Sequence, residues 1–360
     1  MRWAWKVGRV AGIEIRIHAT FLLLLAWIGM VHYLAGHTWQ AAVLGMLFIL
    51  AVFGTIVLHE LGHALTAKRF GIRTFDITLL PIGGIARLER IPERPLHEFL
   101  IAMAGPAVNL ALAAILLALL GSSAGPPDVR EGINTPTAFL SRMAWVNVGL
   151  ALFNLLPAFP MDGGRAFRAI LASRLGPVAA TQAAGRLGQG MALVFGFLGL
   201  LFNPVLALIA LFVWISASEE VSATQFKAGI EGIPVHQAML TEFHVLAPDD
   251  PLALPMAYLT RSLQHDYPVL DGGRLQGVLT HKGLLEALAQ HGEAAPVSCA
   301  METHFETLDP NDLLINALPR LHASHLHAMP VVLGQQVVGL LSFESFGEML
   351  MIHGALHKHQ

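Results

Sequence analysis

The stretch VLHELGHALTAKRF, Val57 to Phe70, places two histidines and a glutamate inside one of the most apolar parts of the chain. His59 and His63 are separated by about 400° of helical rotation, so their imidazoles project from nearly the same face of a helix. This HExxH spacing suits two neutral nitrogen ligands of Zn²⁺, with Glu60 placed to take a proton from an activated water. A catalytic zinc site uses three protein ligands and one open position, so another His, Asp or Glu is expected from elsewhere in the chain.

The composition indicates a membrane protein with a soluble part. The chain has 360 residues, of which 54% are hydrophobic and 13% are charged. Apolar residues fill most of positions 19–217, and a mixed pattern rich in Pro, Gly, Asp and His follows. We predict a polytopic α-helical membrane protein of about six transmembrane helices, the last two short, followed by a soluble domain. The apolar windows are 19–36, 41–66, 98–120, 139–157, 188–201 and 204–217.

Charge and cysteine content exclude two other classes of protein. The formal net charge is −3 and no long basic run occurs, so we expect no nucleic-acid partner. The single Cys299 excludes an internal disulfide framework. Residues 1–18 carry cations and aromatic residues, and no cleavage site follows the first apolar window, which predicts a retained anchor region rather than a removed signal.

Lysine and arginine are distributed unevenly between the predicted loops. Cytoplasmic loops retain these residues, so the distribution predicts a multi-pass protein of the cell membrane with its N-terminus and residues 218 onward in the cytoplasm. The outside loops hold only Arg130 and Arg142. The inside segments hold Arg2, Lys6, Arg9, Arg16, Lys68, Arg69, Arg73, Arg87, Arg90, Arg94, Arg165, Arg168, Arg174 and Arg186.

A second ionisable group follows the fourth apolar window. The stretch NLLPAFPMDGGR, Asn154 to Arg165, ends an apolar helix with two prolines and places Asp162 before two glycines. Irregular backbone at membrane depth is tolerated where it lines a cavity, and an ionisable group there is a functional candidate. Asp162 is therefore our third ligand, while a helix cap or loop aspartate at the membrane boundary is the alternative.

Two asparagines have less specific surroundings. Asn109 follows Gly105 and Pro106 in the third window, and we interpret it as an interhelical packing residue with one polar hydrogen bond. Asn154 either lines the site or bonds backbone groups freed by Pro157.

Several ordered motifs resemble the site-2 protease family of intramembrane zinc metalloproteases, across the whole predicted membrane domain. The resemblance implies one catalytic Zn²⁺ on His59, His63 and Asp162, with Glu60 as general base and Asn154 steadying the substrate or its oxyanion. It also implies an endopeptidase whose substrate is a transmembrane segment, often of a membrane-bound regulator or of its inhibitor, such as an anti-sigma factor. The motifs are GIEIRIHATF at 12–21, HELGH at 59–63, PIGGIARLER at 81–90, AGPAVN at 104–109 and NLLPAFPMDGG at 154–164.

The segment between the second and third windows has a further expected role. Residues 72–90 alternate enough to form short strands, and the resemblance implies a small membrane-associated β-sheet. A peptide bond inside an intact helix is inaccessible to hydrolysis, so a substrate must be unwound locally. An edge strand at Gly83 and Gly84 would hold it extended, while an ordinary surface hairpin is the alternative.

Residues 236–353 contain a repeat of roughly sixty residues. Each copy is predicted as helix, strand, helix, strand, strand, helix, which resembles a cytoplasmic α/β pair of CBS domains. The predicted divisions are a membrane domain at 1–220, a linker at 221–235, CBS domains at 236–295 and 296–353, and a tail at 354–360.

The CBS resemblance implies an intramolecular pair that often forms homodimers and binds adenine nucleotides in its cleft. Adenosine-binding members commonly have Ser or Thr followed three residues later by Asp. Here Thr280 is followed by Gly283, and Ser342 by Ser345, so both aspartates are absent. Thr280 and Ser342 are candidate ligand residues, and a dimerisation or substrate-gating platform is the alternative to nucleotide binding. The histidines His322, His325 and His327 are interpreted as a solvated stretch rather than a second metal site.

We therefore predict an intramembrane metalloprotease with a regulatory or dimerising CBS pair, and two alternatives stay open. A CBS-regulated cation transporter or channel would use His59, His63 and Asp162 to bind a permeating cation, although the apolar segments show no inverted repeat. A catalytically silent membrane chaperone of the same fold would bind substrate and yield no product.

Overall fold

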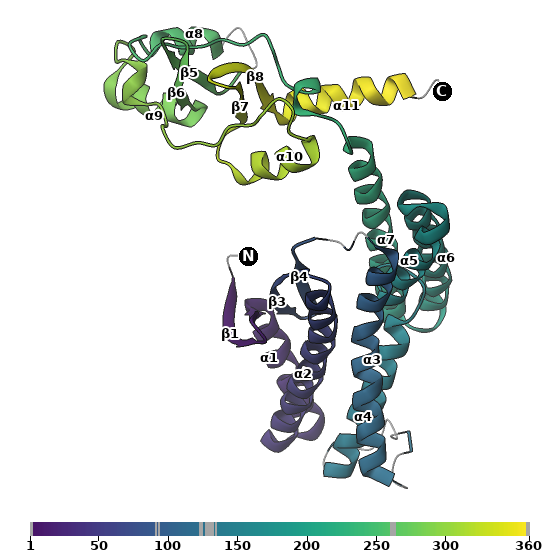
Figure 1. Ribbon diagram of the computed structural model, residues 1–360. Helices are drawn as coiled ribbons and strands as arrows, with labels where there is room; N and C mark the ends of the chain where they lie inside the picture. Colours follow the sequence, from purple (N-terminus) through teal and green to yellow (C-terminus); the bar gives the residue numbers. More distant parts are fainter. Residues whose placement is uncertain are drawn as a thin grey trace. The chain divides into compact units, whose positions relative to one another are not determined.

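The computed structural model consists of two compact units, residues 1–225 and 226–360 (Figure 1). It describes residues 3–90, 92, 94–121, 125–126, 133, 135–259 and 264–357. Two cations used to predict sidedness, Arg2 and Arg130, lie outside the described residues, as do residues 358–360 of the predicted tail.

Helices make up most of the first unit. Within the described residues, α1, α2, α3, α6 and α7 are long and apolar enough to cross a membrane, which confirms a polytopic helical protein. α4 fills most of the fourth predicted window but is less apolar, since it carries Ser141, Arg142 and Asn147. The helices are α1 (Ala19–Gly36), α2 (Trp39–Arg69), α3 (Pro95–Leu120), α4 (Pro136–Asn154), α5 (Asp162–Leu175), α6 (Pro177–Phe202) and α7 (Pro204–Ile230).

Three predicted boundaries differ from the structure. The last two windows were expected to be short, but α6 begins at Pro177 and α7 continues to Ile230. Polar residues such as Arg186 and Glu220 lower the hydropathy of these turns without breaking a helix. Residues 221–230 of the predicted linker are therefore the end of α7, and residues 354–357 of the predicted tail belong to α11 (Phe343–His357).

The first unit also contains a four-stranded sheet in the order β1 (Ala4–Val10), β2 (Ile13–His18), β3 (Thr74–Leu80) and β4 (Gly83–Leu88). β1–β2 and β3–β4 are antiparallel pairs, and β2 and β3 pair in parallel. β3 and β4 confirm the strands predicted within residues 72–90. β1 and β2 lie within residues 1–18, the predicted anchor region, for which no strands were predicted, although the alternation of Ile13, Ile15 and Ile17 with polar residues is typical of a strand.

One face of this sheet packs against α2. Ile13 of β2 and Ile77 of β3 are buried with Leu61 and Ala64 of α2. By helical periodicity, Leu61 and Ala64 lie on the side of α2 opposite to the HELGH histidines. The sheet therefore sets the rotation of α2, so that the histidines point away from the sheet.

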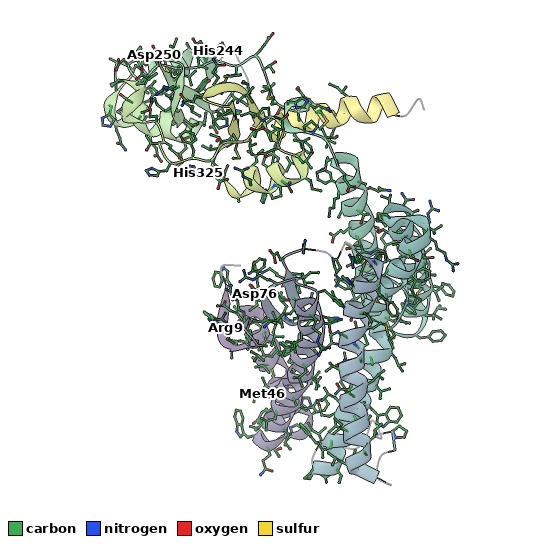
Figure 2. All side chains as sticks on the ribbon, viewed as in Figure 1. Arg9, Met46, Asp76, His244, Asp250 and His325 are labelled. Atoms are coloured by element: carbon green, nitrogen blue, oxygen red, sulfur yellow. The ribbon has the colours of Figure 1, made fainter. Side chains whose placement is uncertain are left out.

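Charged side chains link all four strands. Lys6 Nζ lies 2.7 Å from Glu14 Oε1, and Arg16 Nη2 lies 2.6 Å from Glu14 Oε2. Asp76 on β3, labelled in Figure 2, pairs with Arg87 on β4 and lies 3.8 Å from Arg16 Nη1. Hydrogen bonds from Lys6 and Arg16 lower the pKa of Glu14 to about 2, and the Arg87 guanidinium holds the pKa of Asp76 below its usual range. Opposite charges on neighbouring strands thus favour the observed strand register.

A buried ionic contact ties α5 to two other helices. Arg168 on α5 is 6% exposed; its Nε donates to Glu98 Oε1 on α3 at 2.8 Å, and its Nη1 donates to Glu220 Oε1 on α7 at 2.7 Å. Glu98 is also buried, so the guanidinium neutralises a carboxylate with little access to water. Because α5 begins at Asp162, this contact holds the helix that carries the predicted third ligand.

We expect Arg168→Met to lower the free energy of unfolding by about 3–5 kcal/mol, because Glu98 would stay buried without its cation. Thermal unfolding in detergent measures the change, with Arg174→Met as a matched control on an exposed arginine of α5. Adding Glu98→Leu to Arg168→Met should recover part of the loss. Equal stability of the Arg168 and Arg174 variants would contradict the expectation.

The second unit consists of two copies of the predicted repeat. In each copy the predicted first helix is a single 3₁₀ turn, and the predicted first strand is an isolated parallel bridge, Leu246 with Val269 and Leu308 with Val331. The remaining element order confirms the α/β CBS-type pair. The first copy contains η2 (Val235–Gln237), α8 (Ala253–Leu259), β5 (Tyr267–Asp271), β6 (Arg274–Leu279) and α9 (His281–His291). The second contains η3 (Val297–Cys299), α10 (Leu314–Ala323), β7 (Ala328–Leu333), β8 (Gln336–Ser342) and α11.

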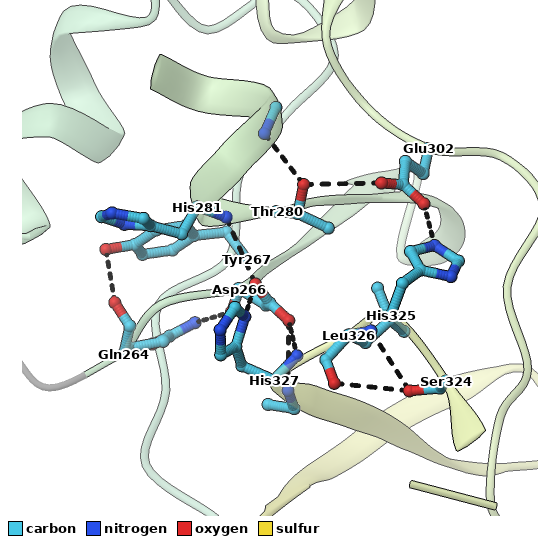
Figure 3. Close-up of polar contacts among 12 residues, drawn as sticks. Gln264, Asp266, Tyr267, Thr280, His281, Glu302, Ser324, His325, Leu326 and His327 are labelled. Atoms are coloured by element: carbon cyan, nitrogen blue, oxygen red, sulfur yellow. Dashed lines mark hydrogen bonds and ion pairs between the residues drawn. The ribbon is translucent and has the colours of Figure 1, made fainter. Parts of the chain in front are cut away.

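The two copies are joined by backbone pairing and by one buried carboxylate. Leu240 of the first copy forms an antiparallel bridge with Leu340 of the second. Asp266 is fully buried, and Figure 3 shows it between the copies, where it accepts from the backbone N–H of His281 at 3.3 Å and of His327 at 2.6 Å. The copies therefore share a polar contact that neither could satisfy alone.

Candidate metal centre

The three predicted metal ligands converge at one point. His59 and His63 project from one face of α2, and Asp162 is the first residue of α5. Asp162 Oδ2 lies 3.0 Å from His59 Nε2 and 3.1 Å from His63 Nε2, and the two nitrogens are 3.1 Å apart. Within the part of the chain that the structure describes, this is the one group of three or more His, Cys, Asp or Glu residues whose donor atoms all lie within 4.8 Å of one another.

The hydrogen bonds of His63 fit a cation at this point. Its Nδ1 lies 2.6 Å from the carbonyl oxygen of Ile101, which can only accept, so Nδ1 carries the proton of the neutral ring. The lone pair of Nε2 then faces the Asp162 carboxylate, an arrangement of two acceptors that is unfavourable without a cation between them. In tetrahedral zinc with bonds of about 2.0–2.1 Å, ligand atoms lie on the order of 3.3 Å apart. The spacing and chemistry of this donor set therefore fit Zn²⁺.

A glycine pair allows Asp162 to reach the histidines. The chain turns through residues 155–161 between α4 and α5, and α5 starts directly against this turn. A Cβ added to Gly163 or Gly164 would lie 2.3 or 2.4 Å from the backbone of the turn. Such distances do not occur between real atoms, so only glycine permits this start of α5 beside Asp162.

Gly105 of α3 lies close to both imidazoles, and the sequence had assigned no role to this residue. A Cβ on Gly105 would lie 2.2 Å from His63 Nε2 and 2.6 Å from His59 Nε2. α3 can therefore approach the imidazoles only with glycine at this position. The available signal was a glycine within an apolar helix, because glycine there costs about 1 kcal/mol relative to alanine and usually has a packing reason.

A cavity of about 490 Å³ adjoins the three candidate ligands. A Cβ on Gly84 would lie 2.8 Å from Glu60 Cγ, so β4 passes directly beside the glutamate. Asn154 lines the cavity while its Nδ2 donates to the Leu150 carbonyl at 3.0 Å. The lining includes His59, Glu60, His63, Asp162, Gly83, Gly84, Asn154 and also Asn109, which the sequence predicted to be a packing residue.

Similarity to known proteins agrees with this site. The chain matches the model of Peptidase family M50 over residues 47–135 and 131–197. The zinc metalloprotease MJ0392 of Methanocaldococcus jannaschii is 33% identical over 280 residues, which cover 78% of each chain. The chain belongs to peptidase family M50, the site-2 protease family. A further relative of this site-2 protease, Rip3 of Mycobacterium tuberculosis, is 32% identical over 371 residues, covering 95% of this chain and 91% of that one.

Two solved structures are similar to parts of this site-2 protease. The Site-2 Protease from Methanocaldococcus jannaschii is 34% identical, with a TM-score of 0.45, and the match covers 61% of this chain and 95% of that one. The CBS domain of a CBS Domain Containing Membrane Protein from Sphaerobacter thermophilus is 18% identical, with a TM-score of 0.31, over 37% of this chain and 96% of that one.

The candidate ligand residues of the second unit lie in different surroundings. The Thr280 hydroxyl accepts from Gly283 N at 3.0 Å and so caps α9. Ser342 lines a cavity of about 630 Å³ between the two copies and accepts from Ser345 N at 3.1 Å. The described residues around this cavity include no lysine or arginine, and its carboxylates disfavour a phosphate group. The ionisable residues there are Glu242, Glu344, Glu348, His244, His265 and His327.

The three histidines of the histidine-rich stretch in the second unit do not converge, and each has a different partner. His325 pairs with Glu302, as Figure 3 shows, and His327 Nδ1 lies 3.6 Å from Asp266 Oδ1. His322 contacts an aromatic ring instead. Among the described residues these histidines do not form a group with metal-ligand spacing.

Proposed function

We propose that this site-2 protease hydrolyses peptide bonds within or beside transmembrane segments of membrane proteins, as in regulated intramembrane proteolysis. The convergence of Asp162 with His59 and His63 of α2, a helix long and apolar enough to span a membrane, is the observation that carries this proposal. An unpaired charge at the centre of a membrane-spanning helix costs about 2.5–3.5 kcal/mol on insertion scales, so the Asp162 carboxylate beside α2 would need a compensating partner such as a divalent cation.

Each group in the cavity would have a separate role. His59, His63 and Asp162 would hold one Zn²⁺. When bound, zinc supplies a Lewis acid that favours attack of water on a carbonyl. Glu60 would take a proton from the attacking water and return it to the leaving amine. Asn154 would steady the substrate or its oxyanion with the amide hydrogen that Leu150 does not accept.

The edge of the sheet would hold the substrate backbone. β4 is the terminal strand in the sheet order, and its Gly83 and Gly84 line the cavity beside Glu60. A locally unwound substrate segment that pairs with this edge would satisfy its own N–H and C=O groups while lying next to the glutamate.

The second unit would regulate the protease or join two copies of it. The distribution of Lys and Arg supports a cytoplasmic location for the N-terminus and for this unit. The cavity between the copies is large enough for a small ligand, and its carboxylates favour a neutral or cationic compound over an adenine nucleotide.

The protein that the protease cleaves would be a single-span regulator or an anti-sigma factor held in the same bilayer.

The purified full chain in lipid vesicles tests the proposal. We expect cleavage of a candidate single-span substrate, loss of cleavage when a chelator removes the metal, and recovery on addition of Zn²⁺, because the site supplies three of four zinc ligands. Mass spectrometry of the products measures the result. Ion flux without cleavage would favour the transporter alternative, and substrate binding without product would favour the chaperone; either outcome would contradict the proposal.

A further inference from the structure

Asn109 is a buried residue of the cavity lining, and its side-chain oxygen is an unused acceptor. It is 1% exposed, and its Oδ1 has no hydrogen-bond partner among the described residues. It also lines the cavity that holds the metal ligands and Glu60. A buried polar atom without a partner costs free energy, and such an atom beside a substrate cavity is suited to a ligand group.

The position of Asn109 can be given relative to Gly105 on the same helix, α3. Gly105 lies against both imidazoles, and Asn109 follows it by one turn on the same face of the helix. The amide is therefore one helical turn from the point where the metal ligands converge. Leu150 and Phe153 of α4 line the same cavity.

Two other asparagines show why Asn109 differs. Asn154 shares the cavity, but its amide already donates to the Leu150 carbonyl. Asn147 of α4 is fully buried and has an unpaired Oδ1, yet it does not line the cavity, and its Nδ2 donates to Met143 O at 2.8 Å. Among these three residues, only Asn109 both lines the cavity and has an unpaired side-chain oxygen.

We propose that Asn109 is a substrate-positioning residue whose Oδ1 accepts a backbone N–H of the unwound substrate segment beside the scissile bond. Unwinding leaves substrate N–H groups without their helical acceptors, so each of them needs another acceptor while the segment lies within the membrane. An amide oxygen at this point supplies one of the missing acceptors, in addition to the edge of β4. This role rests on the proposed function, since it requires that a peptide segment enters the cavity.

The test compares Asn109→Ala with Asn147→Ala in the full-length protein. We expect Asn109→Ala to lower kcat/KM by about tenfold or more, as loss of one buried hydrogen bond to substrate implies, with zinc content unchanged. Asn147→Ala should cleave like the wild type. Equal kcat/KM for the two variants would overturn the proposal, as would a loss in Asn109→Ala that is explained by lost zinc.

A synthetic single-span substrate distinguishes a substrate-positioning role of Asn109 from a purely structural one. Backbone N–H groups around the cut site are replaced by ester oxygens, one position at a time. Replacement of the N–H that pairs with Asn109 should lower kcat/KM about tenfold for the wild type and leave kcat/KM of Asn109→Ala nearly unchanged, because the hydrogen bond is already absent in that variant. Replacements that break pairing with β4 should lower both alike. If Asn109→Ala does not fold, Asn109→Ser takes its place, and equal losses in the wild type and the variant at every position would overturn the proposal. A wild type that cleaves no substrate at all would instead refute the proposed function.

Discussion

Replacement of Glu60 by glutamine is expected to lower kcat for peptide cleavage by about 10²–10⁴-fold, the usual contribution of a general base. Glutamine has the size of glutamate but does not accept a proton near neutral pH. Glu60 lines the cavity, while the proposed metal donors are the neighbouring histidines and Asp162. Zinc content should therefore stay at the wild-type level, measured by elemental analysis of the same preparation used for the cleavage assay.

Glu219→Gln is the matched control for this change, because it removes one carboxylate from an exposed position on α7. It should cleave at the wild-type rate. If Glu60→Gln keeps full activity, Glu60 is not the base. If it loses activity together with its zinc, the glutamate acts in metal binding rather than in proton transfer.

Replacement of Gly105 by alanine is expected to weaken zinc binding by about 10- to 100-fold, the range found when groups that orient metal ligands are disturbed, and to reduce cleavage with it. The added Cβ would lie 2.2 Å from His63 Nε2 and 2.6 Å from His59 Nε2, so one of the helices or rings must move. The His63 ring is held by its hydrogen bond to the Ile101 carbonyl and is 6% exposed, so it has little room. Competition with a zinc chelator measures the affinity.

Gly105→Ala is expected to weaken zinc binding although it should favour the helical conformation of α3. Alanine favours a helix interior by about 1 kcal/mol over glycine, so the helix itself should not be weakened. Gly149→Ala on α4 is the control, because a Cβ there meets nothing within 4 Å. Wild-type zinc affinity in Gly105→Ala would show that α3 does not pack as closely on the imidazoles as described here.

Features that depend on residues close together in the sequence could be predicted without a structure. The spacing of His59 and His63 places them on one helical face wherever that helix lies, and the apolar windows predicted where the helices would form. The repeat in residues 236–353 likewise predicted two similar α/β copies. These inferences hold because helical periodicity and hydropathy act over a few turns of the chain.

Features that depend on long-range packing required the tertiary structure. Asp162 meets His59 across 103 positions of sequence, and spacing alone left it as a ligand or a cap. The parallel pairing of β2 with β3 and the unpaired Oδ1 of Asn109 had no local signature, and a glycine at position 105 indicated close packing without naming the imidazoles as its partner. Each depends on how helices and strands distant in the chain pack together, which is decided by the summed burial and hydrogen bonding of the whole unit and not by any short stretch of residues.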